Sequence, residues 1–199
     1  MADPYFAGDL IRGASRGKPF WQAERQGGPL WMQPQVKGRD REDGRVAEPE
    51  DIRLWSLASF AAGTRGMMNL RYRPLLDGPL FGVSGSDGMD GSRTDRSEMA
   101  AAIGRWANAS GQAELMEAKP VRGEVGLLVV PETQAFDPLL NHEGDFRTYA
   151  ESMWGACRGS LEAGVQPDWF HVDDIDTREF RYAPYPIMWP EAVARRLAD

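Results

Sequence analysis

The sequence is poor in cysteine and in histidine. One cysteine, Cys157, and two histidines, His142 and His171, occur in 199 residues. A single cysteine excludes an internal disulfide and a thiolate metal site, and it favours a small buried side chain at Cys157. The two histidines lack the spacing of metal ligands. We therefore expect no metal site, and a reducing compartment, which we take to be the cytoplasm.

Long apolar runs and an excess of positive charge are also missing. No apolar stretch approaches the roughly 20 residues of a membrane span, and the first residues lack the apolar segment of a signal peptide. Lysine and arginine number 23 against 30 aspartates and glutamates, a formal charge of −7. Such a chain has little attraction for a polyanion. We expect neither a membrane nor a nucleic acid as partner.

Helices and short strands alternate along the chain. This order is typical of the α/β class with parallel sheets. The apolar run at 124–130 is typical of a central parallel strand. A linker or short helix near 111–119 separates an expected first domain, residues 1–110, from a second, residues 120–199. The expected helices are 4–16, 48–62, 94–108, 145–163 and 191–197. The expected strands are 18–24, 66–71, 124–130, 166–172 and a poor one within 180–189, where Pro184 and Pro186 oppose it.

The first candidate for chemistry is Glu24, which we place at the end of a buried strand. In a parallel barrel the carboxyl ends of the strands carry the active site. The alternative is an ordinary glutamate in a salt bridge with an arginine. The polar and aromatic residues around it are Trp21, Gln22, Arg25 and Trp31.

The second candidate is the pair Arg71 and Arg73, directly after the next strand. Two guanidinium groups beside an aromatic ring can bind a carboxylate or sugar hydroxyls. The alternative is ion pairing with nearby acids, namely Asp77, Asp87 and Asp90.

Two further polar segments carry no recognisable chemistry. Residues 82–88 are rich in glycine and serine, but they lack the spacing of a phosphate-binding loop. The acidic residues after the strand at 166–172 lack the spacing of a calcium loop and predict a solvated turn. The sequence therefore predicts no cofactor. These acidic residues are Asp173, Asp174 and Asp176.

Three segments resemble glycoside hydrolase family 42 β-galactosidases. KPFWQAERQGGPLW, residues 18–31, resembles the family's nucleophile strand. Residues 53–108 are similar to its last barrel helix, eighth strand and following loop. GEVGLLVVPETQAFDPLL, residues 123–140, is similar to the start of its trimerisation domain. The resemblance implies a partial (β/α)8 TIM barrel, its last two strand–helix units, followed by a partial flavodoxin- or amidotransferase-like doubly wound α/β domain.

The resemblance also implies roles for individual residues. Glu24 matches the catalytic nucleophile, Trp31 matches an aromatic residue of the galactose pocket, and Arg71 and Arg73 line the site after the eighth strand. The implied substrate is a β-galactoside, and the implied assembly is a homotrimer. The family carries a Glu and a His in the loop where this sequence reads PLLDGPLFG, so substrate contacts there are expected to differ.

Retaining glycosidases act with two carboxylates. The family's acid/base glutamate follows an asparagine on the fourth barrel strand, a region that these 199 residues do not include. We therefore expect a fragment that carries the nucleophile, lacks the acid/base and is inactive alone. The first alternative is a non-catalytic trimerisation or sugar-binding module. The second, a flavodoxin-like nucleotide binder, is disfavoured because Pro131 stands where a glycine-rich phosphate loop is needed.

Overall fold

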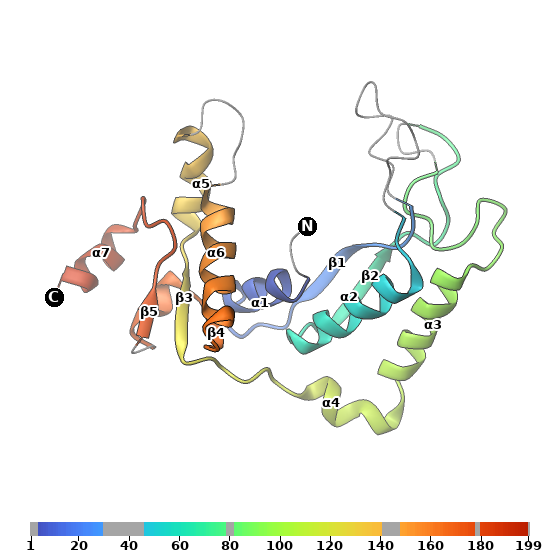
Figure 1. Cartoon of the computed structure of the whole chain (residues 1–199), viewed down its shortest axis with the longest axis horizontal. Coiled ribbons are helices and arrows are strands. Elements are labelled where there is room, and N and C mark those ends of the chain that lie inside the picture. Colours follow the sequence, from blue (N-terminus) through green and yellow to red (C-terminus); the bar gives the residue numbers. More distant parts are fainter. Residues whose placement is uncertain (1–3, 30–45, 79–81, 141–147, 178–179, 199) are drawn as a thin grey trace. The chain divides into compact units, whose positions relative to one another are not determined.

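A computed structural model describes residues 4–29, 46–78, 82–140, 148–177 and 180–198 (Figure 1). The chain forms two compact units. We call residues 20–119 the central unit, and residues 1–19 together with 120–199 the terminal unit.

The central unit contains a parallel pair of strands and its covering helices. Strand β1 spans Trp21–Gln26 and pairs in parallel with β2, Gly66–Leu70. Helix α2 (Pro49–Ala61) lies between them in sequence, and α3 (Asp95–Ala107) follows β2. A short 3-10 turn, η2 (Ser110–Gln112), and helix α4 (Ala113–Glu117) complete the unit, where a linker or short helix was expected.

Local sequence explains where the two long helices of this unit begin. Pro49 occupies the first turn of α2, where its missing N–H costs no hydrogen bond, and the Asp51 carboxylate accepts the Glu48 N–H at 3.1 Å. Thr94 caps α3, which lies within the helix expected over 94–108, and its Oγ1 accepts the Ser97 N–H at 3.3 Å. The helices pack through Ile52 of α2 and Ile103 of α3, which are 1% and 9% exposed.

The expectation of a buried strand over 18–24 is corrected in two ways. The strand runs from Trp21 to Gln26, so Glu24 lies inside it and not at its end. Half of its six side chains, those of Trp21, Ala23 and Glu24, are also exposed, because among the described residues only one face of the β1–β2 pair is covered. The other face carries Trp21 and Met68, which are 60% and 51% exposed.

The terminal unit is built on a three-stranded parallel sheet. Strand β3 (Val125–Val129) lies between β4 (Pro167–His171) and β5 (Phe180–Tyr182). The poor strand expected within 180–189 is confirmed as β5, and Pro184 and Pro186 lack the N–H groups that would extend it. The helical elements of this part are α5 (Pro131–Leu140), α6 (Thr148–Glu162), η3 (Val172–Thr177) and α7 (Glu191–Ala198).

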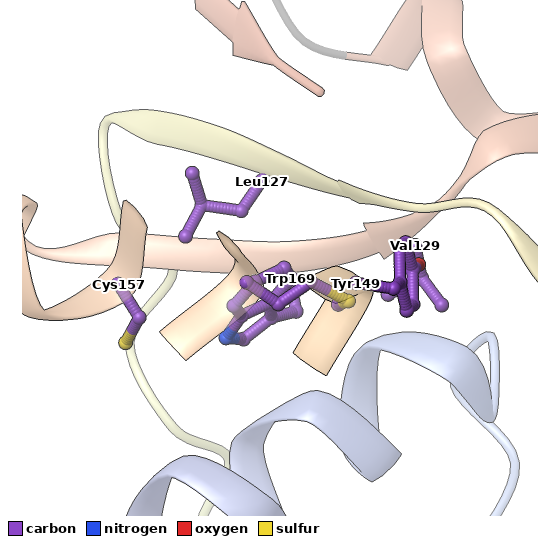
Figure 2. Packing of buried hydrophobic residues seen from close by; sticks show 6 residues of the cluster. Leu127, Val129, Tyr149, Cys157 and Trp169 are labelled. Atoms are coloured by element: carbon purple, nitrogen blue, oxygen red, sulfur yellow. The ribbon is translucent and has the colours of Figure 1, made fainter. Parts of the chain in front are cut away.

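Both faces of this sheet are buried. Leu127 and Val129 of β3 face one side together with Trp169 of β4, and Figure 2 shows them gathered with Tyr149 and Cys157 of α6. The alternate residues form a second cluster on the opposite side, which includes Leu128, Val130, Phe170, Val172, Ile175 and Val193. Burial of both faces explains the near-continuous apolar run within 124–130. The expected α/β class with parallel sheets is confirmed.

Helix α1 (Pro4–Ala14) belongs to the terminal unit, which differs from the expected division into 1–110 and 120–199. The helix packs on β4 through Phe6 and Leu10 and through a very close backbone approach at Gly13. Arg12 adds a polar link, since its Nη2 lies 2.7 Å from Asp168 Oδ1. Helix α5 was not predicted as a helix; Pro131 at its first position is compatible with one.

Candidate functional site

Glu24 lies in a β-bulge of β1. Gln22 pairs with Met67 and Arg25 pairs with Asn69, so three steps along β1 correspond to two along β2. The extra residue falls within Ala23–Glu24, and both of these residues are exposed. A bulge breaks the strict alternation of side chains between the two faces of a strand.

The residues on either side of the bulge face the same helix. Ser59 Oγ of α2 donates to Gln22 Oε1 at 2.7 Å, and Arg25 Nη1 donates to Ser56 Oγ at 2.6 Å. Gln22 and Arg25 therefore both point toward α2 although they are three residues apart. In a regular strand Glu24, two residues after Gln22, would point toward α2 as well. The extra residue takes Glu24 out of this alternation, and its side chain is exposed.

Arg25 is a buried cation that is held by neutral groups. It is 7% exposed, and its Nε and Nη2 donate to Asn69 Oδ1 at 2.9 and 2.6 Å. Nη1 also lies 3.2 Å from Met67 Sδ. Burial lowers the pKa of the Arg25 guanidinium to about 10, so the group stays charged at neutral pH. No described carboxylate forms an ion pair with it, and no salt bridge joins Glu24 to any arginine among the described residues.

The segment after β2 folds back along the ends of both strands. Gly27 N–H donates to Leu70 O at 2.8 Å, which extends the β1–β2 pair beyond Gln26. Arg71 N–H donates to Ser84 O at 2.7 Å, and Ser86 N–H donates to Arg71 O at 2.8 Å. Residues 84–86 thus run beside the end of β2. This loop and Glu24 belong to the same end of the strand pair.

Glycines allow this close approach. A Cβ at Gly28 would lie 1.9 Å from the carbonyl oxygen of Gly85, and a Cβ at Gly27 would lie 2.5 Å from Ser86 Oγ. A Cβ at Gly85 would in turn lie 2.2 Å from the ring of Pro74. Gly85 and Ser86 are therefore part of a structural loop that packs closely against residues 27, 28 and 74.

The two candidate arginines after β2 lie in different surroundings. Arg71 is half-buried, and its backbone is held by the loop. Arg73 is exposed and donates to the Met89 carbonyl at 3.0 Å. Hydrogen bonds from Ser92 lower the pKa of the neighbouring Asp90, and the charge of Arg73 acts in the same direction.

The alternative of ion pairs between these arginines and nearby acids receives little support. Neither arginine forms an ion pair with Asp77, Asp87 or Asp90 within the described part of the chain. Asp87 is 1% exposed, and neither of its carboxylate oxygens has a hydrogen-bond partner there.

The remaining sequence candidates do not belong to the site around Glu24. Trp31 and His142 lie outside the described residues. The acidic residues after β4 form ion pairs: Arg16 contacts Asp173 at 3.1 Å and Asp174 at 2.7 Å. Within the described ranges, no three side chains of His, Cys, Asp or Glu come together as metal ligands. No helix of the described part has the length and apolar character to cross a bilayer.

Sequence reasoning missed the contacts of the residues on either side of Glu24. Arg25 was noted only as a neighbour of Glu24, and the bulge was not foreseen. The available signal was a pair of polar residues, Gln22 and Arg25, at a spacing of three in a strand, facing Ser56 and Ser59 at a spacing of three in the next helix. Both serines are buried, at 0% and 3% exposure.

Comparisons with known proteins place this fold. The sequence matches no protein-family model and no curated protein. Among solved structures, the chain is similar to a β-galactosidase from the Antarctic haloarchaeon Halorubrum lacusprofundi. The TM-score is 0.72 at 25% identity, and the match covers 100% of this chain and 28% of that one.

Two further β-galactosidases match in the same way. The enzyme from Bacillus circulans sp. alkalophilus has a TM-score of 0.76 at 20% identity, over 97% of this chain and 27% of that one. A catalytic mutant of a GH42 β-galactosidase from G. stearothermophilus has a TM-score of 0.74 at 16% identity, again over 97% and 27%. This chain therefore spans less than a third of each matched chain.

The similarity extends over both units and not over one of them alone, because nearly all of the chain is covered. At sequence identities of 16–25%, this similarity shows a shared fold. The chain has the fold of a part of GH42 β-galactosidase chains, and the resemblance drawn from residues 18–31, 53–108 and 123–140 is thereby confirmed at the level of the fold.

Proposed function

We propose that this chain is a part of a retaining β-galactosidase and carries the catalytic nucleophile, Glu24. The observation that carries the proposal is the β1 bulge, which presents a carboxylate on the exposed face of a parallel strand near its carboxyl end. In barrels built from parallel strands this end bears the active site. The likeness to β-galactosidases over nearly the whole chain supports the reaction class.

The proposed reaction has two steps. A Glu24 carboxylate oxygen attacks the anomeric carbon of a terminal β-galactoside while the bond from that carbon to the aglycone oxygen breaks. A second carboxylic acid protonates the leaving oxygen. The galactosyl ester on Glu24 is then hydrolysed by water, which the same second group activates as a base.

The second carboxylate is proposed to come from another polypeptide segment. Retaining glycosidases hold the two groups about 5–5.5 Å apart across the sugar. A barrel has eight strand–helix units, and the described central unit contributes a pair of strands. We propose that the remaining strands cover the face that bears Trp21, Met68 and Glu24.

The residues proposed to line the sugar site are Trp31, Arg71 and Arg73. An indole face can stack on a sugar ring, and guanidinium groups donate to hydroxyl oxygens. Support for the two arginines is their position beside the loop that folds back over the strand ends. The absence of a Glu and a His from residues 74–82 implies other contacts to the sugar hydroxyls.

The terminal unit is proposed to be part of a flavodoxin-like assembly domain that forms a homotrimer in the cytoplasm. Its strand order β4-β3-β5 supports this, since the first strand lies between the second and third, as in flavodoxin-like doubly wound sheets. Sedimentation of the purified chain measures the assembly. A trimer is expected, and a monomer at all concentrations would argue against an assembly role.

Trapping of the glycosyl intermediate tests the proposed nucleophile. The chain is joined to the preceding part of the Halorubrum lacusprofundi enzyme, in place of the 28% that it matches. A 2-fluoro-galactoside with an activated leaving group needs no acid, so mass spectrometry of the peptides should find the sugar on Glu24. Glu24→Gln should abolish labelling, and Glu114→Gln, at an exposed position of α4, should not. A label on another residue would refute the assignment.

A further inference from the structure

The direction of the Glu24 side chain is set by the residues around it. Two neighbours of Glu24, Gln22 and Arg25, bond to serines of the same helix, and this is possible only because the strand has an extra residue between them. If the bulge relaxed, regular alternation would return and would bring residue 24 to the same face as residue 22. The orientation of Glu24 therefore depends on whatever holds the bulge.

Arg25 makes more contacts that can hold the bulge than Gln22 does. It bonds across the strand pair to Asn69, its register partner, through two nitrogens at 2.6 and 2.9 Å. It also reaches the helix through Ser56, whose hydroxyl in turn donates to Ile52 O at 2.5 Å. The guanidinium thus fixes one residue of β1 simultaneously to β2 and to α2. Gln22 supplies a single contact of this kind, to Ser59.

The energetics argue that Arg25 is not there for stability alone. Burial of a cation costs several kcal/mol when no anion compensates it, and the carbonyl and hydroxyl groups around Arg25 are neutral. An apolar side chain of similar length would avoid that cost. The guanidinium instead fixes the orientation of residue 25, because its rigid planar group bonds to Asn69 and to Ser56 at the same time.

We propose that Arg25 is a positioning residue that holds the bulge in β1 and thereby turns the Glu24 carboxylate away from helix α2, toward the sugar. Its catalytic consequence rests on the proposed role of Glu24 as nucleophile. The effect of Arg25 on the bulge and on the direction of residue 24 does not depend on that role and has its own measurement.

Thiol reactivity at position 24 tests the geometry in the 199-residue chain. In a Glu24→Cys chain the new thiol should react readily with a water-soluble disulfide reagent, while Cys157, at 2% exposure, stays protected. Adding Arg25→Met should slow labelling at position 24 by about tenfold or more, because the side chain turns under α2. Adding Arg65→Met, an arginine of the same unit that bonds to Met116 and not to β1, should leave the rate unchanged.

A second variant keeps the test decisive if Arg25→Met loses the far-ultraviolet helical signal. Ser56→Ala removes the contact of Arg25 with the helix, together with the Ser56 bond to Ile52 O, but leaves the contacts with Asn69, and it should slow labelling in the same direction. Arg25→Lys should restore less than the full rate because a single ammonium cannot bond to both partners. Unchanged labelling in folded Arg25→Met, or in folded Ser56→Ala where the first variant unfolds, would overturn the positioning role.

The catalytic consequence is read in the chimera described above. Arg25→Met should lower kcat by about tenfold or more with little change in KM, because only transition-state alignment is lost. The two proposals fail separately. A chimera labelled at a residue other than Glu24 refutes the nucleophile while the thiol result stands, and an unmoved thiol refutes the positioning role while sugar labelling of Glu24 stands.

Discussion

Arg12 joins the first helix of the chain to strand β4 through Asp168, across 156 residues of sequence. Its Nη2 lies 2.7 Å from Asp168 Oδ1 and 2.5 Å from Asp9 Oδ1. Both carboxylates are 2% exposed, so one guanidinium is shared by two buried anions. This arrangement ties helix α1 into the terminal unit, and it makes specific predictions about stability.

Loss of Arg12 should be costly. Arg12→Met leaves Asp9 and Asp168 buried without their shared cation, and breaking a buried ion pair in this way costs about 3–5 kcal/mol. The matched control is Arg158→Met, which breaks an exposed pair with Glu162 and should cost less than about 1 kcal/mol. Urea unfolding followed by circular dichroism compares the two. Equal losses in both variants would contradict the structural role of Arg12.

Asp9 should make stability depend on pH in an unusual direction. Burial raises the pKa of Asp9 above its ordinary value of 3.8, and hydrogen bonds from Arg12 oppose this only in part. The folded chain then takes up a proton at a higher pH than the unfolded chain does. The free energy of unfolding contributed by this group therefore rises as the pH falls from the folded pKa toward 3.8.

The difference between the wild-type chain and Asp9→Asn isolates this contribution from those of other carboxyls. Urea midpoints are measured for both at pH 7 and at successive values down to about pH 4. The urea midpoint of the wild-type chain should rise relative to that of Asp9→Asn as the pH falls. A difference that shrinks on acidification would show that the pKa of Asp9 is lowered by folding instead.

Two glycines in helices should respond oppositely to alanine. A Cβ at Gly13 in α1 would lie 2.4 Å from the carbonyl oxygen of Trp169, so Gly13→Ala should destabilise by about 1–3 kcal/mol through overpacking. Gly155 in α6 has open space where a Cβ would go, so Gly155→Ala should stabilise by roughly 0.5–1 kcal/mol. Thermal unfolding of the two variants measures both changes. Stabilisation by Gly13→Ala would show that α1 does not pack on β4 as described.

The chain alone should not hydrolyse a β-galactoside. A retaining mechanism needs a second carboxylate that protonates the leaving group, and we propose that this group lies in another segment. Release of the chromophore from a nitrophenyl β-galactoside, measured by absorbance, should not exceed the rate with Glu24→Gln. Hydrolysis that Glu24→Gln abolishes would contradict the expected inactivity and would mean that the acid/base is present within these residues.

Much of the secondary structure was predictable because its causes are local. Thr94 with Ser97 marks the start of α3, Pro49 marks that of α2, and the apolar run of β3 indicates a strand buried on both faces. The end of β1 was misplaced by two residues. Gly27 continues the pairing only through Leu70, a contact that sequence spacing does not reveal.

For the candidate site, the sequence identified Glu24 but not what orients it. Alternation along a strand is a local rule, and it is broken here by an extra residue that only the register with β2 reveals. The role of Arg25 depends on Asn69 and Ser56, which reach it from two other elements.

The sequence by itself determined the class of this protein: alternating helices and parallel strands, helix starts set by capping residues, and a carboxylate near the end of a strand. These follow from local hydrogen bonding and from apolar patterning. The tertiary structure decided which unit the first helix joins and which way the carboxylate faces. Both depend on contacts between residues far apart in the chain, Arg12 with Asp168 and Arg25 with Asn69, and such contacts exist only once the strands have paired.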